Sequence, residues 1–66
     1  MKVECWFDSD EFVKKNNGKM LLIQSNPSGY QQVKIRIWNE EDATERDVID
    51  VYGKELIKAI QNAMND

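Results

Sequence analysis

Cys5 is the residue of this sequence best suited to covalent chemistry, because it is the one cysteine among 66 residues. A cysteine nucleophile needs a base beside it, and the chain contains no histidine. In the segment KVECWF, Cys5 alternates with Val3 and Phe7, so these three side chains share one side of a strand. We therefore expect a buried structural thiol rather than a reactive one.

Carboxylates gather in two stretches, residues 8–11 and residues 40–45. Acid–base catalysis needs a pocket that separates the pKa values of two carboxylates, whereas these stretches are typical of a helix start and a solvated loop. Neither stretch has the ligand spacing of a calcium loop, and the Gly-Lys pairs at 18–19 and 53–54 lack the other residues of a phosphate-binding loop. We expect no catalytic site, no metal site and no cofactor, and a protein that is not an enzyme.

The elements that position these residues follow from periodicity. Alternating apolar and polar residues, or a short apolar run between turn residues, predict strands at 2–7, 19–25, 30–38 and 46–52. The second of these is apolar on both sides, which favours the interior of a sheet. The acidic connection 39–45 is too short for a crossover, so the strands beside it should form an antiparallel hairpin.

Two segments have helical features. In residues 53–66, apolar side chains recur at helical spacing, and we expect this helix to pack its apolar stripe on the sheet: Leu56, Ile57, Ile60, Ala63 and Met64. Residues 8–18 fit a short helix with Asp8 as N-cap and Glu11 three residues later. They also fit a hairpin arm ending in the type I′ turn Asn17-Gly18. The first interpretation is favoured, because charges and caps at both ends agree with it.

The resulting prediction is a single α+β domain, residues 1–66. It has a small four-stranded, mostly antiparallel sheet in the order β-α-β-β-β-α, with the C-terminal helix packed on one face. A chain this short buries only about 60% of its unfolded surface. Because a lone cysteine excludes an intrachain disulfide, self-association is the remaining way to enlarge the core.

Strand alternation also defines a second sheet face, which we name the aromatic/basic face: Trp6, Lys34, Arg36, Trp38, Val48 and Tyr52. A face this apolar needs a cover. Three explanations stay open. The short helix covers it with Phe12 and Val13; a second copy or another protein binds it, since Trp, Tyr and Arg carry interface energy; or single-stranded nucleic acid stacks on it.

The charge of the chain bears on its partners. A net charge of −3 disfavours nucleic acid, and no apolar run approaches the length of a membrane span. An acidic decoy using Asp42, Glu45, Asp47 and Asp50 is a further hypothesis. The lone cysteine and the acidic start of the chain suggest the cytoplasm. We expect a small protein-interaction domain, most simply a homodimer that associates through the aromatic/basic face, with binding of single-stranded nucleic acid by the same face as the alternative.

Overall fold

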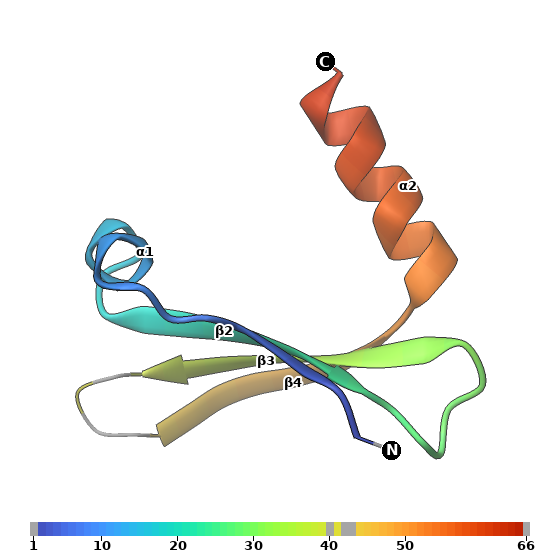
Figure 1. Cartoon of the computed structure of the whole chain (residues 1–66), viewed down its shortest axis with the longest axis horizontal. Coiled ribbons are helices and arrows are strands. Elements are labelled where there is room, and N and C mark those ends of the chain that lie inside the picture. Colours follow the sequence, from blue (N-terminus) through green and yellow to red (C-terminus); the bar gives the residue numbers. More distant parts are fainter. Residues whose placement is uncertain (1, 40, 42–43, 66) are drawn as a thin grey trace.

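In a computed structural model, residues 2–39, 41 and 44–65 are described, without the side chains of 44–46, and they form a four-stranded sheet with two helices (Figure 1). The elements are β1 (Glu4–Phe7), α1 (Asp10–Lys15), β2 (Lys19–Ser25), β3 (Gln32–Asn39), β4 (Thr44–Tyr52) and α2 (Gly53–Met64). Each strand is antiparallel to the next, and their order in the sheet is their order in the chain. The predicted α+β class, the element order, the interior position of β2 and the hairpin of β3 with β4 are confirmed.

The segment after β1 is a helix and not a hairpin arm. Its N-cap is Ser9, whose Oγ accepts a hydrogen bond from the Phe12 N–H at 3.1 Å. The predicted cap, Asp8, is therefore wrong by one residue, because the hydroxyl one position later reaches the third amide of the helix. Asn17 and Gly18 follow with φ of 57° and 83°, and the Gly18 N–H donates to the Val13 carbonyl at 2.8 Å. The Asn-Gly pair thus ends the helix.

The face of the sheet opposite the aromatic/basic face is named here the aliphatic face: Val3, Cys5, Phe7, Leu21, Ile23, Val33, Ile35, Ile37, Ile49 and Val51. α1 lies on this face. The rings of Phe12 and Phe7 have their centroids 5.8 Å apart, and Val13 is buried. The explanation in which α1 covers the aromatic/basic face therefore does not hold.

Helix α2 does not lie across the sheet, which corrects our prediction of its position. It starts at Gly53, directly after β4, and extends away from the strands (Figure 1). It contacts β4, and none of its described residues is buried. Connections between a strand and a helix packed on it usually contain 2–6 residues, whereas here there are none. The chain therefore has no loop with which to turn α2 back onto its own sheet.

The interior of the single chain is small. Among the residues described, the buried apolar side chains are Val13 and Leu22. Cys5 is exposed, and our prediction of a buried thiol is wrong, because the aliphatic face over β1 has little cover. Neither described helix is long and apolar enough to cross a membrane.

Candidate functional site

The register of the strands places the six residues of the aromatic/basic face on one side of the sheet. Trp6 pairs with Leu22, Leu22 with Arg36 and Arg36 with Val48, so these four side chains form a row across the strands. Lys34, Trp38 and Tyr52 lie on the same side, at even spacing from this row along β3 and β4. Their role in binding stays a prediction.

The two tryptophans, 32 positions apart in the chain, meet on this face. Their ring centroids are 6.4 Å apart with a 42° angle between the planes, a geometry within the favourable range for aromatic pairs. Leu22, in the row with Trp6, is only 2% exposed. The indole N–H of Trp38 is buried and has no hydrogen-bond partner in the part of the chain described. This face thus has a packed centre, and the buried Trp38 donor within it is of a kind that native structures seldom leave without a partner.

Beside the tryptophans lies a polar network centred on Gln24, which is buried although it is polar. Its Nε2 donates to Glu4 Oε2 at 2.7 Å, and its Oε1 accepts from Arg36 Nε at 3.0 Å. Because a buried amide is costly unless both ends are hydrogen-bonded, these contacts fix the side chains across β1, β2 and β3. The sequence pattern missed this role, since a glutamine near a strand end is ordinarily solvated.

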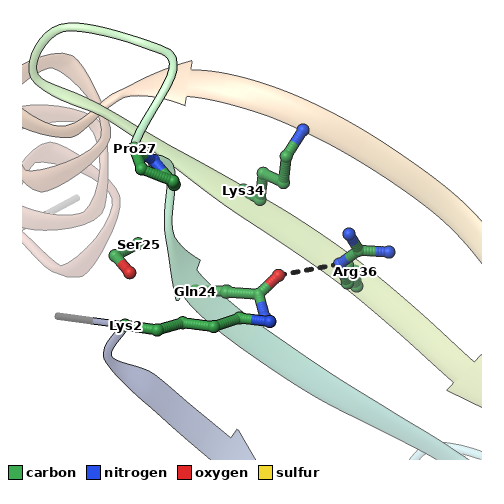
Figure 2. Close-up of a pocket in the computed structure, with 6 residues that line it drawn as sticks. All are labelled: Lys2, Gln24, Ser25, Pro27, Lys34 and Arg36. Atoms are coloured by element: carbon green, nitrogen blue, oxygen red, sulfur yellow. Dashed lines mark hydrogen bonds between the residues drawn. The ribbon is translucent and has the colours of Figure 1, made fainter.

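A shallow hollow of about 420 Å³ opens next to this network: Lys2, Gln24, Ser25, Pro27, Lys34 and Arg36. Figure 2 shows the long side chains of Lys2, Lys34 and Arg36 around it, with Arg36 hydrogen-bonded to Gln24. These cations have acidic neighbours: Lys34 Nζ lies 3.1 Å from Asp50 Oδ1, and Lys2 Nζ lies 4.0 Å from Glu4 Oε2. The hollow can accept a carboxylate or phosphate only in competition with these acids.

The acidic residues do not form a single edge. Asp50 lies on the aromatic/basic face, where it accepts from Lys34 at 3.1 Å and from Asn26 Nδ2 at 2.7 Å. Asp47, three residues earlier, pairs with Ile37 and so belongs to the other side of the sheet. Asp42 and the side chain of Glu45 lie outside the described residues. The described residues therefore do not form the single acidic edge that the hypothesis of an acidic decoy requires.

A second candidate surface combines α2 with the aliphatic face, and sequence reasoning missed it. Ile57, Ile60 and Met64 on α2 are exposed, as are Val3 and Ile49 on the sheet. Sequence reasoning assumed that these two apolar surfaces cover each other within one chain. The absence of any residue between the strand ending at Tyr52 and the helix indicates that the helix does not cover its own sheet.

Among the side chains that the structure describes, no three of the types His, Cys, Asp and Glu gather in a way that could hold a metal ion. Comparisons with protein-family models, with curated proteins and with solved structures found no match to this chain.

Proposed function

We propose that this chain acts by binding protein rather than by catalysis, and that its working form is a homodimer. One observation carries the proposal: the single chain exposes far more surface than a compact chain of its size. A folded chain of 7.7 kDa is expected to expose about 4,300 Å². This chain exposes 5401 Å², an excess of about 1,100 Å². A standard interface covers about 800 Å² per partner, so association of two copies accounts for the excess.

The dimensions of the chain support the same conclusion. Its radius of gyration is 13.0 Å, against about 11 Å for a compact domain of 66 residues. Exposed apolar side chains lie on α2 and the aliphatic face, where Ile57, Ile60 and Ile49 are examples, and also on the aromatic/basic face, where Trp6 and Tyr52 are exposed. Isolated apolar residues at a surface are ordinary, but extended exposed apolar surfaces on one small chain are typical of an interaction site.

We therefore assign self-association to α2 and the aliphatic face, although the sequence suggested the aromatic/basic face. On the aromatic/basic face Leu22 is already buried and Lys34 has an acidic neighbour in Asp50, whereas none of the described residues of α2 is buried. The Trp, Tyr and Arg side chains of the aromatic/basic face are left for a different protein partner, for which these residue types are well suited.

The test uses two substitutions at positions of similar exposure, one on each candidate surface. Ile57 on α2 is 57% exposed and Tyr52 on the aromatic/basic face is 54% exposed. Light scattering of the wild type at micromolar concentration should give twice the mass of one chain. Ile57→Glu should give a monomer and Tyr52→Glu should stay dimeric. A monomeric wild type would refute the proposal, and dissociation by Tyr52→Glu alone would move the interface to the aromatic/basic face.

A second candidate function, binding of single-stranded nucleic acid, has one observation in its favour. The Trp6–Trp38 pair lies on the face that also carries Lys34 and Arg36, and bases stack on aromatic rings between cations. Tryptophan fluorescence should then fall on adding a single-stranded oligonucleotide at low salt, and Lys34→Gln should weaken this response. Unchanged fluorescence at low salt would exclude this function.

A further inference from the structure

We infer that the two copies associate by exchanging α2, so that the helix of each chain packs on the aliphatic face of the other. This inference depends on the proposed dimer and specifies its geometry. In Figure 1, α1 and α2 rise from the same side of the sheet, and α1 lies on the aliphatic face. α2 therefore projects on the side of the exposed aliphatic residues but leaves them uncovered.

The junction between β4 and α2 explains why the helix does not cover its own sheet. The Gly53 N–H donates to the Gln31 carbonyl at 2.9 Å, which ties the first residue of α2 to the turn before β3. Tyr52 is at once the last residue of β4 and the N-cap of α2, with φ of −65° and ψ of 124°. With no residue between the two elements, the direction of the helix is set at this point, away from the strands. A short connection of this kind favours exchange between copies over packing within one chain.

The exchanged helix fits the surface that it would cover. Twelve residues make a helix about 18 Å long. The aliphatic row of Cys5, Ile23, Ile35 and Ile49 crosses the strands, whose three spacings amount to about 14 Å. One helix can therefore lie across the width of the sheet and cover this row.

The apolar stripe of α2 supplies the matching side chains. Ile57 and Ile60 are three residues apart and share one helix face with Met64, so all three can meet the sheet together. A hollow of about 340 Å³ beside α1, with Phe12, Leu21 and Ile37 in its lining, continues the same face and leaves it concave at that end. A second copy of this chain is thus the occupant with the right length and the right chemistry.

Complementation between two variants tests the exchange. Ile60→Glu damages the helix and Ile49→Asp damages the aliphatic face, each at an exposed position where a lone chain tolerates a charge. In either homodimer both helix–sheet contacts carry a charge against apolar side chains, so each variant alone should associate about 100-fold more weakly. In a one-to-one mixture, the heterodimer has one undamaged contact, between the helix of the Ile49→Asp chain and the sheet of the Ile60→Glu chain. Native mass spectrometry distinguishes these chains by mass and should detect mainly the heterodimer.

The outcomes separate the geometry from the proposed function. Preferred heterodimer formation supports exchange, because helix-to-helix or sheet-to-sheet association would place a charge in every contact of the mixed species. A dimeric wild type without complementation would overturn the exchange and leave the proposed dimer intact. A monomeric wild type would overturn both.

A lengthened junction gives an independent test that introduces no charge. Four Gly/Ser residues inserted between Tyr52 and Gly53 would let α2 turn back onto its own sheet. The insertion variant should be a folded monomer by light scattering and circular dichroism. A variant that keeps the dimer affinity of the wild type would contradict the inference.

Discussion

Raising the protein concentration should raise the Tm of this chain, because folding and association are expected to occur together. Within the described residues the buried apolar side chains of one copy are Val13 and Leu22, so a separate monomer should be much less stable than the dimer. For a dimer of two 66-residue chains, the unfolding entropy is about 0.28 kcal/mol/K. A tenfold increase in concentration adds about 1.5 kcal/mol to the free energy of unfolding at 60 °C. Dividing this free energy by the unfolding entropy gives a rise in Tm of about 5 °C for each tenfold increase in protein concentration.

Thermal unfolding followed by tryptophan fluorescence checks this value. Between about 1 and 100 µM protein, the Tm of the wild type should rise by about 10 °C. Ile57→Glu should lower the Tm and remove its concentration dependence, whereas Tyr52→Glu should keep the wild-type slope. A wild-type Tm that stays constant over this range would refute the coupling and show that one copy has a sufficient core of its own.

Three further predictions concern the single chain. Leu22→Ala should lower the free energy of unfolding by about 2–5 kcal/mol in urea titrations, because it leaves a cavity beside Trp6; a loss below 1 kcal/mol would contradict the packed centre. Gln24→Met should cost about 1–3 kcal/mol by the same measurement, since Glu4 and Arg36 lose a hydrogen-bond partner, and an unchanged stability would show that water replaces the amide. Ser9→Ala should cost about 1 kcal/mol and Asp8→Ala much less, and the reverse order would restore Asp8 as the cap of α1.

The arrangement of residues on the sheet could be predicted from the sequence because it follows from local alternation. A strand places successive side chains on opposite faces, so the alternation of apolar and polar residues within each strand determines on which side Trp6 and Trp38 lie. Antiparallel pairing with β2 between them then brings the two rings together on one face. The helical structure of α1 could also be predicted from residues close together in the chain, because capping residues and terminal charges determine a short helix.

The positions of the helices could not be predicted in this way, because periodicity shows which side of a helix is apolar but not what it touches. α1 covers the aliphatic face because Phe12 meets Phe7, a contact between segments that the alternation pattern does not connect. The direction of α2 depends on the backbone angles of Tyr52 and on the hydrogen bond from Gly53 to Gln31. Burial of Gln24 likewise depends on side chains from two neighbouring strands.

Exchange of α2 would also determine how the aromatic/basic face is presented to a partner. The two faces of a sheet point in opposite directions, so covering both aliphatic faces at the centre of a dimer leaves both aromatic/basic faces outward. Each dimer would then carry two copies of the face that includes Trp38, Arg36 and Tyr52. A partner with two binding segments would gain affinity from the second contact without any new kind of interaction. The variants that abolish self-association should therefore weaken binding of a bivalent partner far more than binding of a monovalent one, even though none of the substituted residues lies on the aromatic/basic face.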